Sequence, residues 1–215
     1  VNMVLSSFRR ALSSAIDRQS IAENAFMGYA RGATVPVNTS WSEYSSSLSA
    51  STLSLNADGE KTQTLLAERG FGIYGNTLNL TLLCNEGNAF IRNAANEIAA
   101  ALKPYNVNIT IQLLSSADMK SAVEAGQYDL YISEIKLPAN MALTEFLTYG
   151  GNAAYGIDFS YLTCDEAYVR YRSGEITLDD FISVFNTDMP FIPLAYRNGR
   201  FLYTRDVISE LYCSE

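Results

Sequence analysis

The sequence contains no histidine, and this excludes the commonest catalytic arrangements from within the chain. Ser-His-Asp and Cys-His pairs need an imidazole that takes a proton from the nucleophile. The usual zinc sites are excluded too, because Cys84, Cys164 and Cys213 lie far apart and form no CxxC pair. Three cysteines allow at most one internal disulfide, and we expect three buried or idle thiols instead. We therefore expect neither a metal nor any other cofactor.

Carboxylates are the remaining groups that could carry out chemistry. Two carboxylates flanking a glycosidic bond can hydrolyse it, and Glu134 with Asp129 or Glu145 would be such a pair. No recognisable motif surrounds these residues, and acidic side chains on a protein surface are ordinarily just solvated. The sequence therefore favours binding over catalysis, and a carboxylate-pair hydrolase is the lesser alternative.

Side chains suited to holding a ligand follow the predicted strands or lie in predicted loops. They combine rings for stacking with amides and carboxylates for hydrogen bonding. The candidate ligand-binding residues are Trp41, Tyr44, Asn85, Glu86, Glu134, Asn140, Tyr149 and Tyr155. For Trp41 the alternative is a ring that fixes its own loop, the long Ser- and Thr-rich surface segment 33–55. For the glycine-rich loop 149–156 the alternative is a plain connection.

The elements that must position these residues lie between Thr77 and Glu134, where the pattern reads strand, helix, strand, helix, strand. Leu78, Leu80 and Leu82 alternate with polar residues, which is the period of a half-buried strand. The predicted strands are 78–84, 107–113 and 128–132, and the helices are 91–102, stopped by Lys103-Pro104, and 119–125, with Asp118 as N-cap. Alternating strands and helices of this length predict a mainly parallel sheet covered by helices.

Helices are also predicted on both sides of this unit. Their ranges are 8–16, 17–28, 56–70, 165–172 and 178–188, the last opened by a capping box of Thr177 and Asp180. Near the end of the chain, Asn198-Gly199 predicts a β-hairpin between 191–197 and 200–204, because both turn positions need positive φ.

Composition describes an ordinary globular protein of 215 residues, with 48% hydrophobic and 18% charged residues. The net charge of -8 argues against a nucleic-acid partner and against binding to anionic membrane surfaces, since both rely on clustered Lys and Arg. No apolar run approaches the roughly 20 residues that a membrane-spanning helix needs.

Five short segments, in order along nearly the whole chain, carry a family resemblance. They are Phe8-Arg9-Arg10-Ala11-Leu12 with Ala15-Ile16-Asp17-Arg18, Leu65-Leu66-Ala67-Glu68-Arg69-Gly70-Phe71, Ile91-Arg92-Asn93-Ala94-Ala95, Gly126-Gln127-Tyr128-Asp129-Leu130 and Pro190-Phe191-Ile192-Pro193-Leu194. With them the chain resembles the extracellular solute-binding proteins of ABC importers, in the family 5 class that carries peptides, oligopeptides and nickel.

The resemblance implies an α/β fold, a type II periplasmic-binding-protein-like lobe with a mainly parallel, mixed sheet flanked by helices and a C-terminal β-hairpin. In such proteins a ligand lies between two lobes. Residues 1–215 would form the single C-terminal ligand-binding lobe, and residues 190–215 would return to complete a first lobe that these residues do not include.

The resemblance also implies a function. The lobe would capture a peptide or another small solute without catalysis and deliver it to an ABC transporter permease. The protein would be extracellular or periplasmic, held at the membrane only by a lipid anchor outside this chain. The alternative is the solute-sensing domain of a transcription regulator or signalling protein.

One departure from the family concerns the ligand. Better-known members have a tryptophan, an aspartate and then Asp-Pro after the Tyr-Asp-Leu strand, whereas this chain has Ser133 to Asn140. The acidic group that would neutralise a peptide's amino terminus is then Glu134.

Overall fold

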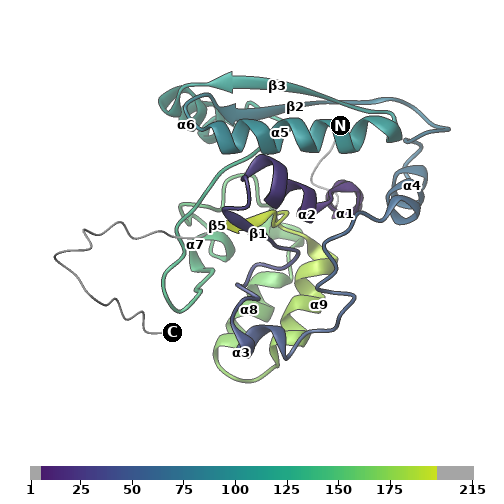
Figure 1. Ribbon diagram of the computed structural model, residues 1–215. Helices are drawn as coiled ribbons and strands as arrows, with labels where there is room; N and C mark the ends of the chain where they lie inside the picture. Colours follow the sequence, from purple (N-terminus) through teal and green to yellow (C-terminus); the bar gives the residue numbers. More distant parts are fainter. Residues whose placement is uncertain (1–5, 198–215) are drawn as a thin grey trace, which may run out of the picture.

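The computed structural model describes residues 6–197 (Figure 1). The strands are β1 (Ala30–Gly32), β2 (Leu78–Asn85), β3 (Val107–Leu114), β4 (Leu130–Tyr131) and β5 (Ala195–Arg197). The helices are α1 (Ser6–Ala15), α2 (Arg18–Ser20) with the π-helical turn η1 (Ile21–Ala25), α3 (Ser42–Ser45), α4 (Gly59–Ala67), α5 (Ala89–Leu102) with the 3₁₀ turn η2 (Lys103–Tyr105), α6 (Ser116–Glu124), α7 (Thr144–Leu147), the 3₁₀ turn η3 (Phe159–Tyr161), α8 (Cys164–Arg172) and α9 (Leu178–Asp188).

The predicted strand–helix–strand–helix–strand unit is confirmed as a parallel sheet with the order β3-β2-β4. β2 and β3 pair along their whole length, from Leu78 opposite Val107 to Asn85 opposite Leu114. β4 pairs only through Leu130 and Tyr131, so it is shorter than the predicted strand 128–132. The strand order reverses around β2, because the chain passes first to one neighbour of β2 and then to the other.

The helices of this unit cover opposite faces of the sheet. Leu78, Leu80 and Leu82 point into the core that α1 and α5 complete. Leu83 packs instead against Met119 and Val123 of α6. The crossovers β2-α5-β3 and β3-α6-β4 run in opposite directions across the sheet, and right-handed crossovers of opposite direction place their helices on opposite faces. The alternation of side chains in β2 therefore matches the two layers of helices.

A second core lies below the sheet in Figure 1, around α8 and α9. Phe181 and Phe185 of α9 are fully buried there. Segment 33–55, predicted as a long surface loop, contributes the buried side chains of Val35, Tyr44 and Leu48, so that prediction is wrong. An irregular chain that crosses packed helices touches them at unequal intervals, and no periodic signal marks it in the sequence.

The returning segment 189–197 joins the two cores. The side chain of Ile192 packs against both. β5 then pairs antiparallel with β1, with Gly32 opposite Ala195. Gly32 is required at this point, because a Cβ on it would lie 2.8 Å from the backbone oxygen of Arg18. Strands of three residues carry too little pattern to be predicted, and no sequence pattern indicates β1.

The Arg18 guanidinium fixes this junction from inside. Its side chain is 4% exposed and faces no carboxylate within hydrogen-bonding distance among the described residues. Instead Nε donates to the carbonyl oxygens of Ala33 (2.9 Å) and Pro193 (3.0 Å), and Nη1 donates to those of Ser13 (2.9 Å) and Ile16 (3.1 Å). Nη2 donates to Ser13 Oγ at 2.7 Å. Burial lowers the pKa of Arg18 to about 10.

Helix starts agree with the sequence in part. The capping box of Thr177 and Asp180 is confirmed, and Asp17 caps α2. Two predictions are wrong: α6 is capped by Ser115, with Asp118 in the first turn, and α4 begins at Gly59, with Asp58 as its N-cap. In each place two residues able to cap a helix lie within three positions of each other, Ser115 and Asp118 in one and Asn56 and Asp58 in the other.

Two sequence predictions fall outside the described residues: the Asn198-Gly199 hairpin and Cys213. Cys84 and Cys164 are buried free thiols. Among the helices within residues 6–197, none has the length and hydrophobicity needed to cross a bilayer.

Replacing Arg18 tests the junction. Arg18→Met should lower the free energy of unfolding of the full-length protein by about 2–4 kcal/mol, since buried carbonyl groups that lose their donors cost roughly 1–3 kcal/mol each. Urea unfolding followed by circular dichroism measures the change. The matched control is Arg170→Met, which removes only an exposed ion pair with Glu175 and should cost under about 1 kcal/mol. Equal effects of the two substitutions would contradict the role given to Arg18.

Candidate ligand-binding cleft

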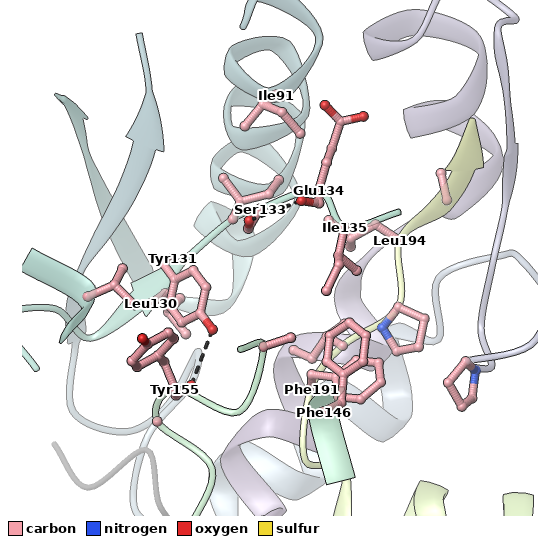
Figure 2. Close-up of a pocket in the computed structure, with 18 of the residues that line it drawn as sticks. Ile91, Leu130, Tyr131, Ser133, Glu134, Ile135, Phe146, Tyr155, Phe191 and Leu194 are labelled. Carbon is pink, nitrogen blue, oxygen red and sulfur yellow. Dashed lines mark hydrogen bonds between the residues drawn. The ribbon is translucent and has the colours of Figure 1, made fainter. Parts of the chain in front are cut away.

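A cleft of about 1870 Å³ opens between the sheet and the helical region. Figure 2 shows its walls: the end of β4 and the chain after it, the first turn of α5, the returning segment before β5, and α7. We use the name "the cleft" for this hollow. It lies at the carboxyl ends of β2 and β4, where the strand order reverses, which is the usual ligand position in open α/β sheets.

One wall of the cleft is apolar. The rings of Phe146 and Phe191 stack with their centroids 4.5 Å apart, and Phe185 of α9 supports Phe191 edge-on at 5.1 Å. Ile135 and Leu194 extend this wall toward β5 (Figure 2), and the side chain of Ile135 is 43% exposed. Such a wall can take up the apolar part of a solute.

Tyrosines form the opposite wall. Tyr131 Oη donates to the backbone oxygen of Tyr155 at 3.2 Å, and Tyr155 Oη donates to Glu124 Oε1 at 3.2 Å. The Tyr128 ring meets Tyr131 edge-on at 5.0 Å. Burial, and to a lesser extent the neighbouring tyrosines, raises the pKa of Tyr131 to about 12. These bonds fix the loop around Tyr155 against the end of β4.

Between these walls a charged cluster centres on Glu134. Asn88 Nδ2 donates to Oε2 at 2.6 Å, and Arg197 Nη1 donates to Oε1 at 2.8 Å. Asn88 also caps α5 by accepting from the Ile91 N–H, so its position is set by the helix. The Arg197 guanidinium lies over the Phe90 ring, 4.9 Å from its centroid. The cluster thereby ties α5, the chain after β4, and β5 together.

Three of the eight residues predicted from the sequence line the cleft: Asn85, Glu134 and Tyr155. Asn85 ends β2, and its Nδ2 donates to Ser116 Oγ at 2.7 Å. The parallel sheet brings Asn85 and Glu134 to the same edge, as the predicted topology requires. Their contact with a ligand stays a prediction.

The other five are not among the residues that line the cleft. Trp41 and Tyr44 stack on each other at 5.7 Å, and Tyr44 is buried in the second core. The Glu86 backbone oxygen accepts from Arg92, and the Asn140 side chain accepts from the Ala142 N–H. Tyr149 is 87% exposed and meets Phe159 edge-on. Their roles in binding likewise stay predictions.

The three carboxylates considered for hydrolysis have separate partners. Asp129 accepts from the Thr81 N–H at 2.8 Å, and Glu145 accepts from the backbone and side-chain nitrogens of Asn152. Glu134 is held by Asn88 and Arg197. Within residues 6–197 no group of three or more Cys, Asp or Glu side chains is placed to hold a metal ion.

Sequence reasoning missed the apolar wall and Arg197. Phe191 and Leu194 belong to the Pro190–Leu194 segment that carried the resemblance, but that segment gave no indication of facing a ligand. Ile135 lies in a stretch without periodicity. Phe146 lies at helical spacing from Leu143, in a segment predicted as a short helix and found as α7, but this spacing does not indicate a ligand. The residues of the apolar wall come together only because the fold packs segments that are far apart in the chain against each other.

The fold and the cleft agree with the protein family that the sequence matches. Residues 6–155 match the family described as bacterial extracellular solute-binding proteins, family 5 Middle. The match covers most of the chain, so the chain belongs to this family. A comparison with curated proteins finds no match.

Solved structures share the fold at low sequence identity. NikA from Staphylococcus aureus, in complex with Ni(L-His)₂, has a TM-score of 0.74 and 20% identity over 92% of this chain and 43% of its own. AppA from Bacillus subtilis, an oligopeptide-binding protein in complex with a nonapeptide, has a TM-score of 0.69 and 18% identity over 90% of this chain and 42% of its own. An oligopeptide-binding protein from Thermotoga maritima, bound to mannohexaose, has a TM-score of 0.68 and 18% identity over 92% of this chain and 42% of its own. The chain thus spans less than half the length of these proteins.

Alkaline pH should reveal the burial of Tyr131. Its pKa in the folded state, about 12, lies above the ordinary value near 10, so its contribution to stability is complete below pH 10 and is lost as the pH rises toward 12. In Tyr131→Phe, the free energy of unfolding should therefore fall less steeply between pH 10 and pH 12 than in the wild type. Urea unfolding at each pH measures this. Tyr74→Phe, at a side chain that is 93% exposed, should behave as the wild type. Equal slopes in all three proteins would contradict the prediction.

Proposed function

We propose that this chain is the ligand-capturing lobe of an extracellular solute-binding protein, which takes up a peptide or another small solute and delivers it to an ABC transporter. The observation that carries the proposal is the cleft, at the reversal of strand order in a chain of family 5. It combines an apolar wall with a small number of fixed polar groups, which is the usual make-up of a small-molecule site.

The size of the cleft favours a solute larger than a single amino acid. Its volume of about 1870 Å³ exceeds the roughly 300–1,000 Å³ of most small-molecule pockets. Relatives with this fold were solved with a nonapeptide, with mannohexaose and with Ni(L-His)₂. Short peptides are our first choice, because stacked aromatic rings and aliphatic side chains line one wall.

We propose binding without catalysis. The carboxylates near the cleft accept hydrogen bonds from the protein's own groups, and Asp129 and Glu145 are each held by a backbone N–H. A pair that hydrolyses glycosides needs one carboxylic acid that delivers a proton to the leaving oxygen and one carboxylate that faces the reacting carbon. Nothing in these contacts favours such a pair.

The proposed partner is the permease of an importer, and the proposed location is outside the cytoplasmic membrane, with a lipid anchor as the tether. Both rest on membership of the family. The proposed domain arrangement is that residues 1–215 form the C-terminal lobe and that residues 190–215 return toward a first lobe.

Ligand binding can be measured by thermal unfolding of the full-length protein with di- to hexapeptides, oligosaccharides and nickel–histidine complexes. A ligand that binds only the folded state adds RT ln(1 + [L]/Kd), about 2.7 kcal/mol at a hundredfold excess over Kd. We expect a rise in Tm with at least one class of solute. No rise with any class, in a folded protein, would overturn the proposal.

A substitution in the apolar wall tests whether the solute binds in the cleft. Ile135→Asn should weaken binding of the solute identified above about tenfold or more, since apolar contact area is replaced by an amide that has to be desolvated. The matched control is Val169→Asn, on α8 outside the cleft, where the side chain is 65% exposed. Isothermal titration gives Kd for both variants. Equal Kd values would show that the solute binds elsewhere.

A further inference from the structure

The two members of the Glu134–Arg197 pair differ in what they have left to offer a ligand. Both carboxylate oxygens of Glu134 already accept a short hydrogen bond, one from Asn88 and one from Arg197. A guanidinium carries five N–H donors. Within residues 6–197, the hydrogen bond of Arg197 to Glu134 uses one of them, on Nη1. An ionised carboxylate has about four acceptor sites, and these two bonds use two of them. Within residues 6–197 the larger spare hydrogen-bonding capacity therefore lies with the cation.

Arg197 is also held in place. Its guanidinium lies on the face of Phe90, and the bond to Glu134 fixes its orientation. The side chain is nevertheless 44% exposed, and it lines the cleft beside Ala195 and Leu194. An arginine fixed at one edge and open at the other presents a ready fork to a planar anion such as a carboxylate, which it can bind through two parallel hydrogen bonds.

The charged residues that line the cleft also favour an anionic ligand. Although the whole chain has a net charge of -8, the described charged residues that line the cleft are four cations, Arg9, Lys120, Lys136 and Arg197, against two acids, Asp129 and Glu134. Lys120 is paired with Glu124, which is not among the residues that line the cleft, and the other three cations still outnumber the two acids. A concave site with an excess of one sign of charge concentrates ligands of the opposite sign. An acidic protein with a basic cleft is thus arranged to attract an anionic solute into it.

We propose that Arg197 forms a carboxylate subsite of the cleft and that the solute therefore carries an acid group there. This proposal rests on the proposed function and deepens it by naming the ligand class. Glu134 acts as a positioning residue that orients the guanidinium, and it does not hold the amino terminus of a peptide. The apolar wall of Ile135 and Phe191 then contacts the rest of the solute.

The test compares each free acid with its amide, and a free amino terminus with an acetylated one. Isothermal titration of the full-length protein is run with trileucine, trileucinamide and N-acetyl-trileucine, and with gluconate against gluconamide. We expect at least one free acid to bind ten- to a hundredfold more tightly than its neutral counterpart, the range for a hydrogen-bonded charge. N-acetylation should change Kd less than threefold, since no group is reserved for the ammonium.

Substitutions test whether Arg197 causes the preference for the free acid. Arg197→Gln should abolish the preference for the free acid, so that acid and neutral compound bind alike. Glu134→Gln should strengthen binding of the acid, because the guanidinium loses its internal carboxylate. Arg170→Gln, which removes an exposed arginine on α8, should keep the preference of the wild type.

The outcomes separate the two proposals. Equal affinity for acid and neutral compound, or tight binding of mannohexaose without binding of any acid, would overturn the carboxylate subsite and leave solute binding intact. A preference that survives in Arg197→Gln, or a loss of binding on N-acetylation together with its loss in Glu134→Gln, would also overturn it. Binding of none of the compounds in either panel would overturn both proposals.

Discussion

The buried guanidinium of Arg18 is the interaction on which the architecture depends. It binds carbonyl oxygens from the end of α1, from Ala33 after β1 and from Pro193 before β5. Within residues 6–197 this cation has no carboxylate hydrogen-bond partner, and burial is tolerated because each of its three nitrogens donates a hydrogen bond. Because the segment from Phe191 to Arg197 forms a wall of the cleft, the same bonds that stabilise the junction also position the candidate site.

The parallel sheet supplies the second constraint. Since the chain leaves β2 for one neighbour and returns to the other, α5 and α6 lie on opposite faces and the carboxyl ends of β2 and β4 remain open. Asn85 at the end of β2, with Ser133 and Glu134 after β4, lines the cleft at this edge, which is the usual ligand position in open α/β sheets. The second core, built on α8 and α9, closes the other side through Phe146 and Phe191. The cleft thus forms where the two cores face each other.

Family membership and the details of the cleft answer different questions. Relatives with the same fold hold a peptide, a sugar oligomer and a nickel complex, so the fold by itself does not select the ligand. Our proposal assigns this selection to the few polar groups in the cleft. Among the described residues, Glu134 accepts on both oxygens and Arg197 donates to it through one nitrogen, and the proposed acidic solute rests on this difference.

The sequence by itself determined the parallel unit, the helix starts at Asp17 and Thr177, and the family. It also placed Asn85 and Glu134 at the carboxyl ends of strands, because alternation, capping and chain order can be read along the chain. It did not reveal the burial of segment 33–55, the pairing of β1 with β5, or the wall of Phe146 and Phe191. These depend on contacts between residues more than forty positions apart, as Phe146 and Phe191 are. Arg197 shows this most clearly, because only the folded chain places it beside Glu134, 63 residues away.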